Sequence, residues 1–182
     1  MSENTATRAL QAPPMRWPML RMLRPKDWIK NSFVLAPVIF SGSFLHPGSV
    51  QHALAAAICF CLVSSATYVF NDLMDRESDR LHPRKRFTRP LAAGLVSPKA
   101  AYLMIAALLA SAAAIAFFTP RIVSVVVAYL LLQVAYTMKL KHMPVVDLFA
   151  IAAGFVLRVY AGSLSVSVEL SFWMFITTLC LA

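Results

Sequence analysis

Residues 52–79 read HALAAAICFCLVSSATYVFNDLMDRESD, an apolar run that passes directly into an acidic segment. A helix needs about 20 mostly apolar residues to cross a bilayer. The run from His52 to Phe70 is long enough and is rich in Ala, Val and Leu. It therefore predicts a membrane-spanning helix with carboxylates at one end.

The composition of the whole chain points the same way. Of its 182 residues, 59% are hydrophobic and only 14% are charged, whereas about a quarter of a soluble domain is charged. Disordered, collagen-like and disulfide-rich classes are excluded, since the chain is neither poor in apolar residues nor rich in Gly or Cys. We therefore expect an integral membrane protein.

The apolar runs predict an all-α, polytopic bundle of transmembrane helices. Because the last run is too short to cross comfortably, we expect a C-terminally truncated product. We divide the chain into a polar, basic N-terminal segment (1–23) and a transmembrane domain (24–182). Five full spans and a partial sixth are expected at Ile29–Leu45, His52–Phe70, Ala100–Phe118, Ile122–Met138, Val145–Leu164 and Leu170–Ala182.

Positive charge is concentrated in three connections. The chain has 17 Lys and Arg against 8 Asp and Glu. All of the 17 except Arg121 and Arg158 lie in residues 1–30, in residues 71–99 or just after the fourth span. This pattern predicts that these three segments face the cytoplasm. It also accounts for the basic excess without a nucleic-acid partner, which we do not expect.

The acidic segment suits a metal–diphosphate site. If the helix continues past Phe70, Asp72, Asp75 and Asp79 share one face at spacings i, i+3 and i+7, and Asn71 lies close to it. Stacked carboxylates repel one another, so a cation should offset them. Mg²⁺ binds carboxylates together with substrate phosphate oxygens. We therefore predict Asp72, Asp75 and Asp79 as Mg²⁺ ligands.

The basic residues that follow have two interpretations, which the sequence leaves open. They could be a cytoplasmic loop in contact with lipid headgroups, or some could bind phosphate, as Arg does in bidentate fashion. The residues concerned are Arg76, Arg80, Arg84, Lys85, Arg86 and Arg89.

These motifs resemble the UbiA superfamily of intramembrane prenyltransferases. The resemblance lies in Asn71-Asp72-x-x-Asp75-x-x-x-Asp79, His82-Pro83-x-Lys85-Arg86 and Arg89-Pro90-x-Ala92-x-Gly94. Further segments resemble its decaprenyl-phosphate phosphoribosyltransferase branch. They are Arg24-Pro25-Lys26-Asp27-Trp28-Ile29-Lys30-Asn31, Tyr136-x-x-x-Leu140-Lys141-x-x-x-x-x-Asp147 and Gly154-Phe155-Val156-Leu157-Arg158.

The resemblance implies a bundle of about nine spans in a bacterial-type inner membrane, with a Mg²⁺ cofactor and a lateral groove for a polyprenyl chain. The bundle could form a homo-oligomer. The implied reaction transfers 5-phosphoribosyl from phosphoribosyl diphosphate to a polyprenyl phosphate and releases diphosphate. One alternative is transfer of a prenyl group from its diphosphate to an aromatic acceptor such as 4-hydroxybenzoate. The five-residue separation of Tyr136 and Lys141 disfavours that acceptor. The other alternative is an inactive remnant, because a second aspartate-rich segment is absent from the sequence.

The resemblance also assigns roles to single residues. Asp72, Asp75 and Asp79, assisted by Asn71, would bind Mg²⁺–diphosphate. The second wall of the site would come from Tyr136, from Lys141 on phosphate and from Asp147 on metal or ribose hydroxyls. The phosphate-binding candidates that it implies are Lys85, Arg86 and Arg89. Lys30 and Arg158 are further phosphate-binding candidates. For Arg158 a structural pairing is the alternative, since an ionisable residue so deep in a span has either a function or a partner.

Overall fold

The computed structural model describes residues 17–182 and is helical throughout, with no strand among these residues. Residues 1–16 of the predicted N-terminal segment, with Arg8 and Arg16, lie outside the described range. The elements are α2 (Pro18–Met22), η1 (Pro25–Leu35), α3 (Ala36–Phe40), η2 (Ser43–Leu45), α4 (Pro47–Met74), α5 (Arg76–Leu81), α6 (Lys85–Thr88), α7 (Pro98–Phe118), η3 (Pro120–Ile122), α8 (Val123–Met138), η4 (Leu140–His142), α9 (Val146–Ser165) and α10 (Phe172–Leu181).

Four helical segments in the described part of the chain are long and apolar enough to cross a membrane. They are α4, α7, α8 together with η3, and α9, which confirms the second to fifth predicted spans. Proline helps to set two of the helix starts. Pro47 and Pro98 occupy first-turn positions of α4 and α7, where a missing N–H costs nothing. The Ser97 hydroxyl caps α7 by accepting the Ala100 N–H at 3.2 Å.

The first predicted span is not a continuous α-helix. Residues 25–35 form a 3₁₀ segment, and α3 follows over five residues. Pro37 lies in the first turn of α3, where its ring fits a helix start and cannot donate a hydrogen bond. With rises of about 2.0 Å and 1.5 Å per residue, the two elements together reach about 30 Å, the thickness of the hydrocarbon core. The partial sixth span is the short apolar helix α10.

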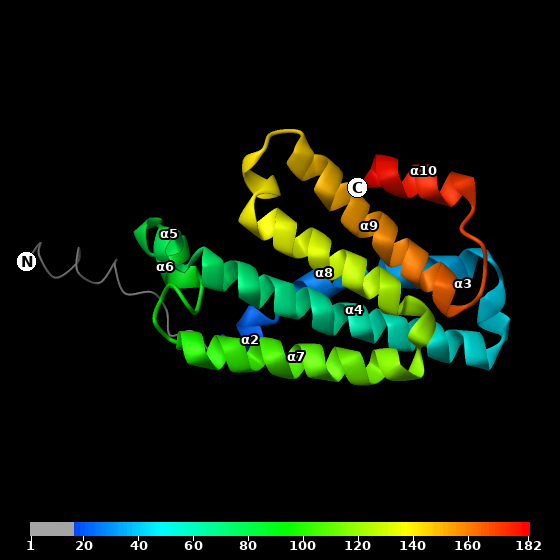
Figure 1. Cartoon of the computed structure of the whole chain (residues 1–182), viewed down its shortest axis with the longest axis horizontal. Helices are drawn as coiled ribbons and strands as arrows, with labels where there is room; N and C mark the ends of the chain where they lie inside the picture. The colour runs from blue at the N-terminus through cyan, green and yellow to red at the C-terminus, as the bar shows by residue number, and fades with distance from the viewer. Residues whose placement is uncertain (1–16) are drawn as a thin grey trace, which may run out of the picture.

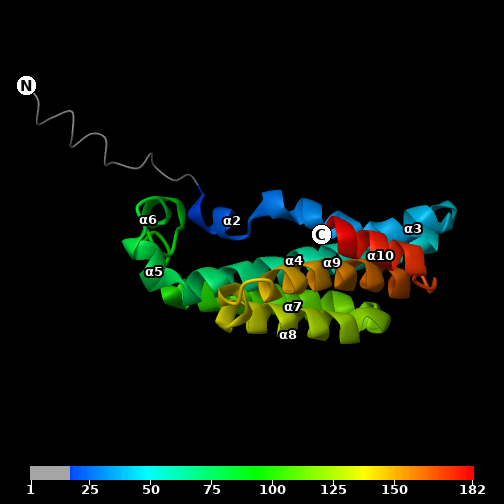
Figure 2. The ribbon, with the colours of Figure 1, turned by 90° about the horizontal axis from the view of Figure 1, so that it is seen from above.

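The long helices lie side by side in layers (Figure 1). Seen from above, η1, α3 and α10 lie on one side of α4 and α9, and α7 and α8 lie on the other (Figure 2). The main core joins α4, α8, α9 and η1, with Phe60 and Tyr129 as its largest buried side chains. Large apolar side chains such as Leu103 and Phe117 are exposed on α7, as expected for a surface that faces lipid.

The described parts of the three basic connections meet at one end of the bundle, where α2, α5, α6 and the turn between α8 and α9 are found (Figure 1). The predicted grouping of these segments is thus present in the fold. Part of the N-terminal segment also belongs to the packed structure, because Met22 of α2 is buried against Val69, Leu91, Val96 and Ala101.

Candidate functional site

The three aspartates of the predicted motif lie together where α4 meets α5. Asp72 is in the last turn of α4, Asp75 is the residue between the helices, and Asp79 is in α5. Helical hydrogen bonds continue across the junction, from Asp75 N–H to the Asn71 carbonyl at 2.9 Å and from Asp79 N–H to the Asp75 carbonyl at 2.8 Å. The predicted face is therefore preserved although α4 ends at Met74. We call Asp72, Asp75 and Asp79 the acid cluster.

The guanidinium of Arg89 lies at the centre of the acid cluster. Its Nη1 is 2.6 Å from Asp79 Oδ2, 3.0 Å from Asp72 Oδ1 and 3.8 Å from Asp75 Oδ2. The side chains of Asp72 and Asp79 are only 4% and 2% exposed, whereas that of Asp75 is 24% exposed. Buried carboxylates need a cation at contact distance, and Arg89 supplies one to all three.

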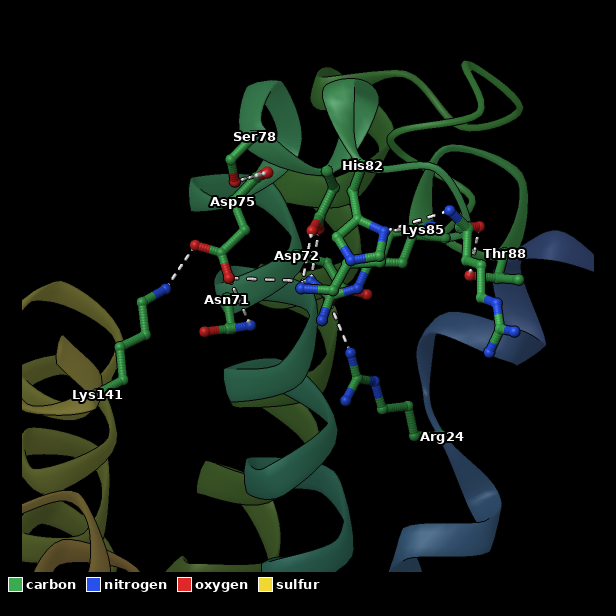
Figure 3. Close-up of polar contacts among 12 residues, drawn as sticks. Arg24, Asn71, Asp72, Asp75, Ser78, His82, Lys85, Thr88 and Lys141 are labelled. Carbon is green, nitrogen blue, oxygen red and sulfur yellow. Dashed lines mark hydrogen bonds and ion pairs between the residues drawn. The ribbon is translucent and has the colours of Figure 1, made fainter. Parts of the chain in front are cut away.

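Three further cations reach the acid cluster from separate parts of the chain. Arg24 Nη2 is 2.7 Å from Asp72 Oδ1, and Lys85 Nζ is 3.4 Å from Asp79 Oδ1. Lys141 Nζ is 2.5 Å from Asp75 Oδ1, and Figure 3 shows it approaching from the side opposite to Arg24. With Arg89, four cations surround three carboxylates, so the site carries a net positive charge of one.

Packing fixes the loop that carries Arg89. Leu91 and Val96 are buried against α4 and α7 in the small core near Met22. The chain turns back between them at Gly94, whose φ of +73° is a left-handed conformation that glycine adopts readily. The Leu95 N–H closes the turn on the Pro90 carbonyl at 3.0 Å. The Arg89-to-Gly94 motif therefore holds one guanidinium at the acid cluster.

The motif at residues 24–31 attaches η1 to α4 through polar contacts. Besides the pair between Arg24 and Asp72, Trp28 Nε1 donates to Ser65 Oγ at 3.0 Å and Asn31 Nδ2 donates to Ser64 Oγ at 3.1 Å. We had not predicted a site role for Arg24. The sequence shows only its place in the motif, since its partner lies 48 residues away.

The acid cluster offers the donors that a divalent cation arriving with a diphosphate would need. Its carboxylate oxygens are hard donors, and Arg89 Nη1 lies 2.6, 3.0 and 3.8 Å from an oxygen of Asp79, Asp72 and Asp75. In the present arrangement, no three acidic, His or Cys side chains within residues 17–182 are placed so that they could hold a metal ion, so the carboxylates would have to draw together to bind Mg²⁺. Mg²⁺ is commonly held by one or two carboxylates plus substrate phosphates, so an open set of ligands suits this chemistry.

A second group of predicted residues lines a cavity of about 200 Å³ between η1, α4, α8 and α9. Lys30, Tyr136 and Arg158 all belong to it. We had not predicted its other polar residues, Tyr68, Tyr129 and Gln133. The sequence did indicate two of them, because Tyr129, Gln133 and Tyr136 put three polar side chains on one face of an otherwise apolar helix, at spacings i, i+4 and i+7. We call the six residues Lys30, Tyr68, Tyr129, Gln133, Tyr136 and Arg158 the polar cavity.

Two predicted residues join neither group. The guanidinium of Arg86 lies over the ring of Phe87, 4.4 Å from its centroid. The carboxylate of Asp147 accepts the Leu148 N–H at 2.8 Å in the first turn of α9. Asn71 does join the acid cluster, since its Nδ2 donates to Asp75 Oδ2 at 3.2 Å.

Comparison with known proteins identifies the family. Residues 34–182 match the model of the UbiA prenyltransferase family. Two similar relatives are named decaprenyl-phosphate phosphoribosyltransferase. The protein from Corynebacterium glutamicum is 39% identical over 85% of this chain and 48% of its own length, and the one from Mycolicibacterium smegmatis is 37% identical over 85% and 50%. This chain thus spans about half the length of these relatives.

A solved structure shows the same arrangement of helices. It is described as a UbiA homolog from Archaeoglobus fulgidus bound to DMAPP and Mg²⁺. It superimposes with a TM-score of 0.75 at 26% identity, and the match covers 91% of this chain and 60% of that one. Both the motifs and the fold agree with the family match. The chain belongs to the UbiA prenyltransferase family.

Proposed function

We propose that this chain is a Mg²⁺-dependent membrane transferase that moves 5-phosphoribosyl from phosphoribosyl diphosphate to a polyprenyl phosphate. The observation that carries the proposal is the acid cluster, held among four cations at one end of the bundle. A site with both carboxylates and excess positive charge suits a diphosphate that enters with its metal.

The donor's diphosphate would bind at the acid cluster. Asp75, the most exposed of the three carboxylates, would be first to bind the metal, and Asp72 and Asp79 would complete the site. Arg89 and Lys85 would then turn from carboxylate to phosphate oxygens. Mg²⁺ supplies a Lewis acid that neutralises charge on the departing diphosphate.

The reaction balances without another reactant. An oxygen of the lipid phosphate forms a bond to C1 of the ribose, and the bond from C1 to the diphosphate oxygen breaks. The diphosphate leaves with the electron pair. Charge grows on the leaving oxygen, and Arg89, Lys85 and Lys141 would stabilise it once they contact the diphosphate.

Two observations favour phosphoribosyl transfer over aromatic prenylation. Relatives at 37–39% identity are named decaprenyl-phosphate phosphoribosyltransferases. Tyr136 and Lys141 are also five residues apart, a separation that disfavours an aromatic acceptor. The resemblance to a homolog bound to DMAPP keeps the prenyl alternative as an outcome of the test.

We further propose that the end with the acid cluster faces the cytoplasm of a bacterial cell, with the chain in the inner membrane. Lys and Arg of the three basic connections gather at this end, as the positive-inside rule requires. A water-soluble donor would enter there, and the lipid acceptor would enter from the bilayer. The proposal also includes assembly of the chain as a homo-oligomer.

The test is transfer of label in detergent. Purified protein receives Mg²⁺, polyprenyl phosphate and phosphoribosyl diphosphate labelled in the ribose. We expect label in the lipid phase, and none after EDTA is added.

A parallel reaction with polyprenyl diphosphate and an aromatic acid tests the alternative. Product in that reaction alone would replace phosphoribosyl transfer with prenylation. No product in either, while a longer relative works under the same conditions, would contradict activity of this chain.

A further inference from the structure

Arg158 is a buried cation that pairs with no carboxylate among residues 17–182. Its side chain donates to Asn31 Oδ1, the Gly154 carbonyl and the Tyr129 hydroxyl, each at 2.8 Å. The residue is 4% exposed, and no ion pair in the described part of the chain includes it. Burying a charge without a counter-ion is strongly unfavourable. A guanidinium has five N–H donors, so donors remain after these three bonds.

The cavity beside Arg158 is suited to an anion. The six residues of the polar cavity supply two cations, three phenol hydroxyls and one amide. All of these groups can donate hydrogen bonds. None of its lining residues is acidic. Lys30 also keeps 45% of its side chain exposed, paired at 2.9 Å with Asp27, so its ammonium can turn toward an incoming anion.

The polar cavity lies one helical turn deeper in the bundle than the acid cluster. Tyr68 lines it, and Asp72 follows four residues later on α4, about 6 Å along the helix axis. Arg24 joins the two, since its guanidinium pairs with Asp72 and lies 4.8 Å from the centroid of the Tyr68 ring. The two places are therefore linked by Arg24 and separated by about one helical turn along α4.

The cavity also has an apolar side. Ile151 and Phe155 of α9 belong to its lining, and Ile151 is 39% exposed. A ligand with an anionic head in the cavity could leave its hydrocarbon chain along this surface, in lipid. A phosphate monoester of a lipid has this combination, and a free phosphate lacks the chain.

We propose that the polar cavity binds the phosphate group of the lipid acceptor, with Arg158 and Lys30 as its cations. The acceptor's identity as a polyprenyl phosphate rests on the proposed function. The cavity and the acid cluster are then separate sites for the two phosphate-bearing substrates, and the oxygen that attacks the ribose is held between them.

Binding to the purified protein tests this without catalysis. The probes are geranylgeranyl phosphate, geranylgeraniol and inorganic phosphate. We expect Lys30→Gln and Arg158→Gln each to weaken binding of geranylgeranyl phosphate by roughly tenfold or more, because each removes a charged hydrogen-bond donor. Lys26→Gln, in an exposed lysine of the same segment, should bind it as the parent does. Binding of Mg²⁺–diphosphate should be unchanged in all three variants.

The outcomes separate this inference from the proposed function. Parent-like binding of geranylgeranyl phosphate by Lys30→Gln overturns the inference, and this variant keeps the test valid if Arg158→Gln fails to fold. Equal affinity for inorganic phosphate overturns the lipid assignment. If phosphoribosyl transfer is absent but lipid phosphate binding depends on Lys30 and Arg158, the cavity is supported and the proposed function fails.

Discussion

Arg24 and Asp72 form an ion pair of 2.7 Å across 48 residues of chain. The pair joins the start of η1 to the last turn of α4. Asp72 is buried, while Arg24 has a left-handed backbone, with φ of 50°, and stacks on Tyr68. A left-handed backbone is uncommon for a residue other than Gly. Here it occurs at Arg24, the residue that joins the motif at residues 24–31 to the acid cluster. One contact therefore orders both the acid cluster and the segment that borders the polar cavity.

We expect Arg24→Gln to lower transfer activity by roughly tenfold or more, because loss of a charged hydrogen bond misplaces Asp72. Arg24→Lys should recover part of the loss, since it restores the charge. Arg21→Gln, in an exposed residue of α2, is the control. The measurement is kcat and KM for phosphoribosyl diphosphate, and parent-like values for Arg24→Gln would show that Arg89 alone positions Asp72.

Gly162 should be essential for packing. A Cβ at this position would lie 1.9 Å from the Val34 carbonyl oxygen, whereas one at Gly154 would meet only Arg158, Gln133 and Tyr129 side chains at 3.5 Å or more. Gly162→Ala must push η1 away from α9, and overpacking of this kind costs about 1–3 kcal/mol of unfolding free energy. Gly154→Ala should leave the thermal midpoint in detergent unchanged or slightly raised. Equal midpoints for the two variants would contradict the close contact.

Metal binding should depend on diphosphate. Because four cations surround three carboxylates, free Mg²⁺ meets a site that is already positive. We expect calorimetry to show binding of Mg²⁺ that is tighter by roughly tenfold or more when diphosphate is present. Equally tight binding of Mg²⁺ alone would mean that the cations leave the acid cluster at little cost.

Replacing Arg89 and replacing Arg86 should have different effects on diphosphate affinity, although both residues lie in the same basic loop. Arg89→Gln removes the cation shared by the acid cluster and should weaken diphosphate binding by roughly tenfold or more. Arg86→Gln removes only a cation that stacks on Phe87, so its effect on diphosphate affinity should be small. A larger loss for Arg86→Gln in the same binding assay would reverse this assignment.

The sequence predicted what depends on short spacings. The i, i+3, i+7 pattern placed three aspartates on one face, and runs of apolar residues located four of the five full spans. The features that the sequence did not predict depend on side-chain packing and on contacts between residues far apart in the chain. Arg24 received no role because nothing local shows that Asp72 is its partner. Residues 29–45 are apolar enough to span, yet residues 25–35 form a 3₁₀ segment in which Trp28 and Asn31 make polar contacts with α4. Arg86 is in the predicted motif, but its contact with Phe87 is a matter of side-chain packing.

The proposed function requires that the acid cluster bind the diphosphate of phosphoribosyl diphosphate. The most direct test compares Asp75→Asn with Glu77→Gln in the transfer assay with labelled donor. Both lose one carboxylate, but Asp75 faces Arg89 and Lys141. Glu77 is exposed and, among residues 17–182, pairs only with Arg76 and Arg80. We predict that Mg²⁺-dependent labelling of the lipid is abolished in Asp75→Asn and retained in Glu77→Gln. Full labelling by Asp75→Asn would show that the acid cluster is not the diphosphate site.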